Sequence, residues 1–334
     1  MTVNITTDTD FVPHPQKTEA NTSAPIVAET MQHADVKLSK VLFTGEGSSQ
    51  VLLLGKGRGR CVALWERDDG IDPFRILSIK NSEVDPNDAC KMPENRVCVG
   101  YADGSLAVFN TAKEDLTLMS RIPSVHDGSA SRAICRNGNG VLSASSNGTL
   151  SDVDVETGKA RTVENNGEPS LDPIKLLIPS KKALDAVSSL CTHPAQSNLI
   201  CCGTDDGIVG LIDARNVRGA SITSTYLVAK KGITQTMFHP TCADSLLVSA
   251  NDGSLIRIDA SAAPIAMGSR SQKDVIWLEG ELANSLRLDP IRNESIFPIS
   301  SFDIHSDTVV AASSIGMVSL YQQLPFYPNN TVFG

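Results

Sequence analysis

Apolar and polar residues alternate along this chain in short segments, and each segment is interrupted by one glycine. Five such segments align without a gap, at residues 97–110, 141–154, 199–213, 246–259 and 309–322. Alternation with a period of two predicts β-strands, and an Asp-Gly or Asn-Gly pair supplies the positive φ that a tight hairpin turn needs. The pattern therefore predicts one β-hairpin written five times.

The predicted turns have the same short sequence. An aspartate or asparagine precedes the glycine in four copies, and Ile315 takes that place in the last. Because Asp and Asn side chains accept hydrogen bonds from the turn backbone, we interpret these residues as structural rather than catalytic. The predicted structural turn residues are Asp103, Gly104, Asn147, Gly148, Asp206, Gly207, Asp252, Gly253 and Gly316.

A further copy of the hairpin precedes these five, at "VLLLGKGRGRCVALWE" (51–66), with Arg60 at the position of the turn glycine. The spacing of Gly55, Gly57 and Gly59 resembles that of a phosphate-binding loop. Such a loop must lead into a helix whose N-terminus meets the phosphates, whereas a short strand and another turn signal follow here. We therefore interpret this stretch as a hairpin turn and expect no nucleotide cofactor.

One hairpin cannot bury its apolar face alone, but units of roughly 40 to 45 residues stacked radially can, and this period is typical of a β-propeller. We count six hairpins. Two intervals between turn glycines are long, and we expect insertions between neighbouring blades at 163–182 and 261–290. A degenerate blade in either insertion would raise the number of blades from six to seven, and the sequence leaves both numbers open.

The order of segments also predicts how the ring closes. Pro325 and Pro328 make the C-terminal end a poor strand, since proline has no backbone donor for a ladder. We expect "VKLSKVLF" (36–43) to pair with the last blade instead. The predicted domains are a disordered tail at 1–33, the propeller at 34–326, and a second tail at 327–334.

Composition narrows the function classes. The chain has 334 residues, 41% of them hydrophobic, a formal charge of -9 and a pI near 5.2. A field of this sign repels polyanions, so nucleic acid is not an expected ligand. The sequence has neither a secretory leader pattern nor a stretch of 18 apolar residues, so we expect no secretion and no membrane insertion.

Residues with catalytic or metal-binding chemistry are scattered. The eight cysteines form no CxxC pair, and none of the six histidines lies in a nucleophile or metal-ligand pattern. His193 and His239 precede prolines at equivalent repeat positions, which favours a structural role. We therefore expect no enzyme activity, no metal, no cofactor and no small-molecule substrate.

Two repeats resemble WD40 repeats, at "THPAQSNLICCGTDDGIVGLIDAR" (192–215) and "FHPTCADSLLVSANDGSLIRIDAS" (238–261). Each has a His-Pro pair ahead of the hairpin and an Asp-Gly turn within it. The chain departs from regular WD40 repeats because it has no Gly-His dipeptide and carries tryptophan at the end of a third strand only at Trp65. The resemblance implies an all-β WD40-type propeller of six or seven blades, closed by an N-terminal strand.

Within the WD40 proteins, the order of blades resembles the small nucleoporin of the Y-shaped outer-ring complex of the nuclear pore. The resemblance spans roughly residues 50 to 326 and includes the ending "SFDIHSDTVVAASSIGMVSLYQQLPF" (301–326). It implies a non-enzymatic scaffold at the nuclear envelope that supports protein and mRNA transport, binds α-solenoid nucleoporins, and has a second role at kinetochores. Two alternatives stay open. One is another intracellular WD40 adaptor, such as a ubiquitin-ligase substrate receptor or a chromatin-complex subunit, and the less favoured one is a propeller hydrolase.

One segment carries the expected partner site. In "DVIWLEGELANSL" (274–286), four apolar residues have the spacing of one helix face, with Trp277 beside them. The favoured interpretation is that this face folds back on the propeller. The functional alternative is that it docks on an α-solenoid, with the tryptophan as an anchor. The candidate partner-binding residues are Trp277, Leu278 and Leu282.

Overall fold

The structure is a computed structural model that describes residues 28–44, 49–68, 73–165, 168–169, 187–196, 198–214, 222–260, 277 and 286–326. Within these residues the regular structure is almost entirely β-strand, with two short 3-10 turns. The prediction of an all-β fold is therefore confirmed.

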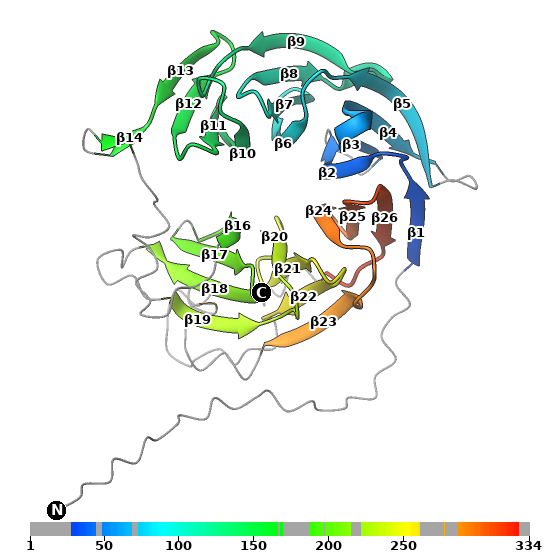
Figure 1. Ribbon diagram of the computed structural model, residues 1–334. Coiled ribbons are helices and arrows are strands. Elements are labelled where there is room, and N and C mark those ends of the chain that lie inside the picture. Colours follow the sequence, from blue (N-terminus) through cyan, green and yellow to red (C-terminus); the bar gives the residue numbers. More distant parts are fainter. Residues whose placement is uncertain are drawn as a thin grey trace, which may run out of the picture.

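Six four-stranded antiparallel sheets are arranged like blades around a central axis (Figure 1). The first blade is β2 (Lys37–Thr44), β3 (Gln50–Lys56), β4 (Cys61–Arg67) and β5 (Phe74–Asn81). The second is β6 (Pro86–Met92), β7 (Arg96–Tyr101), β8 (Leu106–Asn110) and β9 (Thr117–Ile122), and the third is β10 (Ser131–Asn137), β11 (Gly140–Ser145), β12 (Leu150–Asp154) and β13 (Lys159–Thr162).

The second half of the ring repeats this plan. The fourth blade is β16 (Val187–Thr192), β17 (Leu199–Thr204), β18 (Ile208–Asp213) and β19 (Ile222–Leu227), and the fifth is β20 (Ile233–Phe238), β21 (Ser245–Ala250), β22 (Leu255–Asp259) and β23 (Arg287–Arg292). The sixth blade takes β24 (Ile299–His305), β25 (Thr308–Ser313) and β26 (Met317–Gln322) from the end of the chain. A two-stranded ladder of β14 (Glu164–Asn165) and β15 (Glu168–Pro169) follows the third blade.

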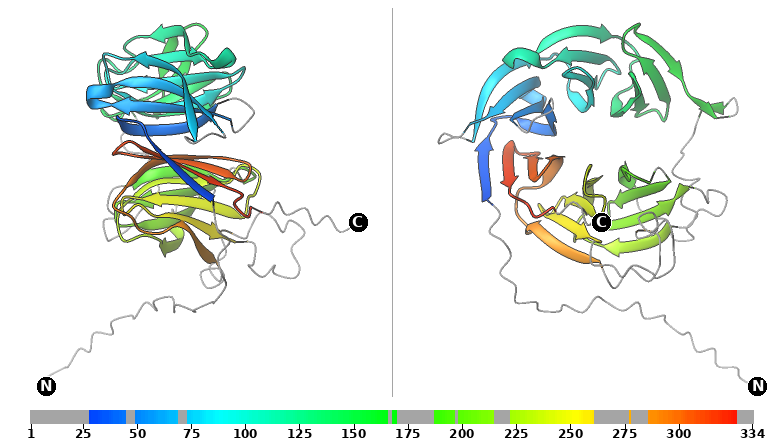
Figure 2. Two further views of the ribbon diagram at one scale, coloured as in Figure 1. Left: turned by 90° about the vertical axis from the view of Figure 1, so that its right-hand side faces the viewer. Right: turned by 180° about the vertical axis from the view of Figure 1, so that it is seen from behind.

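The ring is closed by β1 (Ala28–His33), which is the outermost strand of the sixth blade and pairs antiparallel with β26 (Figure 2). The hydroxyl of Tyr321 donates to Glu29 Oε1 at 2.9 Å, and the amide of Phe74 in the first blade donates to Gln32 Oε1 at 2.9 Å. The closing strand therefore ties the last blade to the first.

This closure corrects the expected pairing. Residues 36–43 do not pair with the last blade, because β2 is the innermost strand of the first blade and pairs with β3. Residues 28–33, expected to belong to a disordered tail, are the closing strand. Closure by an N-terminal strand holds, but it uses a segment that lies earlier in the chain, and the rest of the expected tail, 1–27, lies outside the described residues.

The insertion expected at 261–290 also has a different place in the fold from the one predicted. It connects β22 to β23 within the fifth blade rather than joining two blades, and its last residues belong to β23. Of the helix face expected at 274–286, only Trp277 and Leu286 are among the described residues. The first hairpin is found as expected, since β3 and β4 pair across a short 3-10 turn at Gly57–Gly59.

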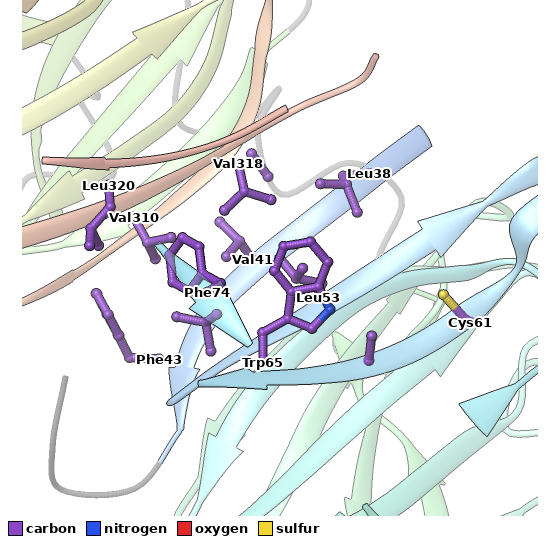
Figure 3. Close-up of a cluster of buried hydrophobic side chains, with 13 residues drawn as sticks. Leu38, Val41, Phe43, Leu53, Cys61, Trp65, Phe74, Val310, Val318 and Leu320 are labelled. Atoms are coloured by element: carbon purple, nitrogen blue, oxygen red, sulfur yellow. The ribbon is translucent and has the colours of Figure 1, made fainter. Parts of the chain in front are cut away.

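Apolar side chains fill the spaces between blades. Figure 3 shows the cluster between the first and sixth blades, in which Trp65 and Phe74 pack against Val310, Val318 and Leu320. Comparable clusters join the first to the second, the second to the third, the fourth to the fifth, and the fifth to the sixth blade. The core is therefore a set of apolar layers between sheets.

The five predicted turn glycines adopt the left-handed conformation that glycine tolerates best. Their φ values are +78° at Gly104, +86° at Gly148, +80° at Gly207, +80° at Gly253 and +94° at Gly316. At Gly207 an added Cβ would also collide with the carbonyl of Ala229. A side chain there would meet both backbone strain and a steric clash.

We expect the closing strand to contribute strongly to stability. Two truncated chains, one lacking residues 1–27 and one lacking 1–33, differ only by β1. The shorter chain should melt about 5–10 °C lower than the longer one, because losing the ladder on β26 costs a few kcal/mol. Differential scanning calorimetry measures both transitions. Equal melting temperatures would show that β1 does not hold the ring together.

Candidate functional site

The predicted turn residues lie at the hairpin tips between the second and third strands of the blades. Asp103 Oδ1 accepts from the amide of Ser105 at 3.0 Å, and Asp252 Oδ1 accepts from the amide of Ser254 at 3.0 Å. Asn147 Oδ1 accepts from the amide of Thr149 at 2.9 Å. Although burial raises the pKa of Asp252, hydrogen bonds from Ser254 hold it below its usual value. These carboxylates therefore stabilise turns as anions.

Trp277 lies inside the propeller. Its side chain is 2% exposed, stacks edge-on against Phe238 at 5.3 Å, and donates from Nε1 to the carbonyl of Ala243 at 3.1 Å. It belongs to the apolar cluster between the fourth and fifth blades, with Leu286 packed against that cluster. For Trp277 the structure agrees with the favoured interpretation that this segment folds back, because its indole fills the protein's own core, and not with the alternative that it anchors a partner. Leu278 and Leu282 lie outside the described residues.

Every inner strand has a register shift at the same place, which the sequence analysis missed. Each shift leaves one unpaired bulge residue, and a bulge re-aims its side chain. The six bulge residues are Ser39, Asn87, Arg132, Ser188, Thr234 and Ser300. All six line a cavity of about 540 Å³ at the centre of the ring.

Four of the six bulge residues hydrogen-bond to the next blade. Ser39 Oγ donates to the Pro86 carbonyl at 3.1 Å. Three more donate likewise to the following blade: Ser188 Oγ to Ile233 O at 2.5 Å, Ser300 Oγ to Leu38 O at 3.1 Å, and Asn87 Nδ2 to Ser131 O at 2.9 Å. In the fifth blade the residue after the bulge, Gln235, makes the equivalent contact, because its Nε2 donates to the Phe302 carbonyl in the next blade at 2.8 Å. These contacts tie the inner ends of neighbouring blades together.

Charged groups near the channel are also engaged between blades. Lys40 Nζ lies 2.9 Å from Asp88 Oδ1, and the other oxygen of Asp88 accepts from the amide of Ile134 at 2.9 Å. Lys91 Nζ lies 2.7 Å from Asp303 Oδ2, which accepts from the amide of Phe43 at 2.8 Å. These carboxylates therefore serve structural contacts rather than acid-base chemistry.

A cleft of about 590 Å³ opens between the fourth and fifth blades, on the side of the hairpin tips. Asp206, Lys230, Asp252 and Glu294 are among its lining residues. Lys230 pairs with Glu294 at 2.7 Å, and the Lys230 amide donates to Asp252 Oδ2 at 3.1 Å. The walls are otherwise mostly apolar, and the hydroxyl of Ser254, which donates to Asp252 Oδ1 at 2.5 Å, belongs to the hairpin turn.

Two histidines join neighbouring blades from the turns between the first and second strands of their own blades. The Nε2 atom of His193 lies 3.0 Å from the Ala243 carbonyl in the next blade, and that of His239 lies 2.8 Å from the Ser306 carbonyl. In each case Nδ1 accepts from the backbone amide three residues ahead. The equivalent His-Pro positions therefore hold a turn and bind it to the neighbouring blade.

His126 is buried in the third blade. Its Nε2 lies 2.8 Å from Ser143 Oγ and its Nδ1 lies 3.0 Å from Thr149 Oγ1, while Ser143 contacts Ser131 at 2.9 Å. Burial lowers the pKa of His126, although the charge of Asp127 opposes this effect. The ring is therefore held neutral within a chain of hydroxyl groups.

Exposed apolar side chains lie on several outer strands, and two of them lie on each outer strand of the first two blades. Ile76 and Ile79 on β5 are about half exposed, as are Leu118 and Met119 on β9. The two blades are linked here, since Ser78 Oγ donates to Asp115 Oδ1 at 2.6 Å. We call these four residues the outer-strand patch.

Among the described residues, no three His, Cys, Asp or Glu side chains gather as metal ligands. In the same part of the chain, no helix is long and apolar enough to cross a membrane.

Acid should destabilise the propeller through His126. Because the pKa of His126 is depressed in the folded state, unfolding is accompanied by proton uptake as the pH falls below about 6.5, the ordinary histidine value. We expect the free energy of unfolding to decrease by up to about 1.4 kcal/mol per pH unit from this one group. Urea titrations between pH 7.5 and 5 measure it.

The variant that tests this assignment is His126→Asn. Its control is His33→Asn, at an exposed position of β1. His126→Asn should be less stable at pH 7.5, since it loses its place in the hydroxyl network, but its stability should fall less with acid. His33→Asn should behave like the unsubstituted chain. An unchanged pH slope in His126→Asn would contradict the assignment.

Comparison with known proteins gives sparse sequence likeness. No protein-family model matches the chain. A segment of 91 residues is 33% identical to "Periodic tryptophan protein 1 homolog" of Drosophila melanogaster, covering 27% of this chain and 18% of that protein. The chain thus matches less than a fifth of the length of this relative.

Solved structures give a far more extensive likeness. The chain is similar to the WD40 β-propeller domain of Doa1, with a TM-score of 0.61 and 14% identity over 89% of this chain and 96% of that one. It is also similar to a chain in the mitotic checkpoint complex, with a TM-score of 0.64 and 12% identity over 97% and 99% of the two chains. At such low identity these likenesses establish the fold alone: the chain is a six-bladed WD40-type β-propeller.

Proposed function

We propose that this propeller is a non-catalytic scaffold subunit that holds other proteins together. The observation that supports this most directly is the use of its polar side chains. The carboxylates, histidines and hydroxyls that converge at the channel and between blades are engaged in turns and blade-to-blade contacts. WD40 propellers are generally scaffolds or adaptors, and the fold therefore agrees with this use.

The outer-strand patch supports a protein partner. Leu118 and Met119 are each 53% exposed, and they lie on a strand with one unpaired edge. Exposed apolar groups beside an open strand edge are typical of protein interfaces. We therefore assign the first two blades as the partner-binding side.

The proposed location is the outer ring of the nuclear pore, bound to α-solenoid nucleoporins. The support is the resemblance of the blade order to the small WD40 nucleoporin of the Y-shaped complex. This proposal includes the associated roles in protein and mRNA transport and at kinetochores, and it includes no direct contact with nucleic acid or membrane. The alternative is another WD40 adaptor, acting in ubiquitin ligation or on chromatin.

Fluorescent tagging of the full chain in live cells tests the location. A continuous nuclear rim is the expected signal, and diffuse nucleoplasmic fluorescence would favour the alternative adaptor. The variant Leu118→Asp with Met119→Asp should lose the rim signal, because two carboxylates placed in an apolar contact must be desolvated.

The matched control is Ile296→Asp, at a residue that is 86% exposed and lies outside the outer-strand patch. It should keep the rim signal. All variants should melt within about 2 °C of the unsubstituted chain, since surface changes usually alter stability by less than about 0.5 kcal/mol. A rim signal that survives the double substitution would place the partner contact on another face.

A further inference from the structure

One boundary between blades differs from the other five. Within the described residues, apolar clusters join every pair of neighbouring blades except the third and fourth. In both face-on views the ribbons of these two blades also stand further apart than those of other neighbours (Figures 1 and 2). We call the facing sides of the sheets β10–β13 and β16–β19 the open seam.

Equivalent repeat positions in the other blades show which buried apolar side chains the third blade lacks. Six residues before the turn glycine, four blades place a fully buried side chain against the next blade: Cys98, Cys201, Leu247 and Val310. Two residues after that glycine they place another: Leu106, Val209, Leu255 and Val318. In the third blade these positions are Leu142 and Leu150, which are only half-buried and belong to no cluster.

The fourth blade shows the same deficit on its side of the open seam. Seven residues before the turn glycine, Val97, Val141, Leu246 and Val309 are buried against the preceding blade, whereas Ile200 is half-buried. Leu190, on the inner strand of the fourth blade, is 50% exposed. Burying a leucine side chain contributes about 1.5–3 kcal/mol, so these walls leave apolar surface that a contact would bury favourably.

The inner strand of the third blade also lacks the residues that bind the next blade. At the bulge position it has Arg132, where three other blades have serine, and at the following position it has Ala133. Arg132 is exposed, lines the central cavity, and forms no ion pair with any described residue. Both the apolar and the polar contacts that join other blades are therefore absent within the described residues.

We propose that the open seam binds an extended segment of a partner protein that is apolar on both of its faces, with one carboxylate directed at Arg132. Both walls are sheet faces, and a strand presents side chains on two opposite sides with the same period of two. The cation at the inner end of the seam is complementary to an acidic group, which pairs with arginine through two parallel hydrogen bonds. This proposal rests on the scaffold role and adds a second contact to it.

Cys135 is a natural reporter for this contact. It is exposed, lies on β10 in register with Leu142, and lines the same cavity as Arg132. A partner in the open seam must cover its thiol. The variant Ile296→Cys adds a reference thiol at a remote exposed position.

The experiment measures alkylation of Cys135 by N-ethylmaleimide, relative to the reference thiol, using mass spectrometry of the full chain. In the purified chain both thiols should react. In intact cells the relative rate at Cys135 should fall about tenfold, the protection expected when about 90% of the seams are occupied. Arg132→Glu should restore most of the rate, since it places like charges together.

Four results would overturn the proposal. One is equal relative rates in cells and in the purified chain, and another is persistent protection in Arg132→Glu. Protection in the purified chain that rises with protein concentration would assign the seam to a second copy. Protection of Cys135 in the purified chain at all concentrations would show that the seam is already covered. If deleting residues 170–182 then removed this protection, the covering segment would belong to this chain. None of these results changes the localisation test, so the scaffold role is judged separately.

Discussion

Each blade of this propeller depends on burying the two faces of its sheet against its neighbours. A single sheet of four short strands cannot exclude water from both faces, so one blade is stable only as part of the ring. The apolar layers, such as that around Trp65 and Phe74, bury these faces, but apolar contacts do not by themselves fix an orientation. The polar contacts between inner strands then determine how neighbouring blades are oriented.

Those polar contacts follow one geometric device. Each inner strand has a β-bulge at the same place, and from this position Ser39, Ser188 and Ser300 reach a backbone carbonyl of the next blade. This contact needs only a short side chain with a hydrogen-bond donor, so serine and asparagine can both make it. Arginine at the third of these positions is too long and too charged for the same contact, which makes the third blade chemically distinct.

The ring is therefore uneven, and the unevenness bears on function. Among the described residues, five boundaries are built from complementary apolar faces, and the closing strand β1 secures one of them. Within the described residues, the open seam and the outer-strand patch are two of the places where apolar side chains are left exposed or half-exposed. A scaffold with two separate contact surfaces can hold two proteins in a defined geometry, which agrees with the proposed role better than a catalytic one.

The repeated hairpins and their turn glycines were determined by the sequence alone, because a period of two and a positive φ are local requirements. The closing strand was not. The apolar run at 36–43 looked suited to it, but such a run indicates an inner strand buried on both faces, whereas Ala28–His33 lies at the outer edge and is accordingly polar. Likewise, the spacing around Trp277 could not tell a core contact from a docking face, since both bury the indole.

Only the tertiary structure revealed the bulge contacts and the open seam. Ser39, Asn87 and Arg132 share no residue type, and their equivalence appears only once the register shifts align them. Leu142 and Leu150 fit the apolar pattern as well as their counterparts in other blades. Whether a given apolar face is covered depends on which sheet lies opposite it, and that neighbour is chosen by contacts between residues far apart in the chain.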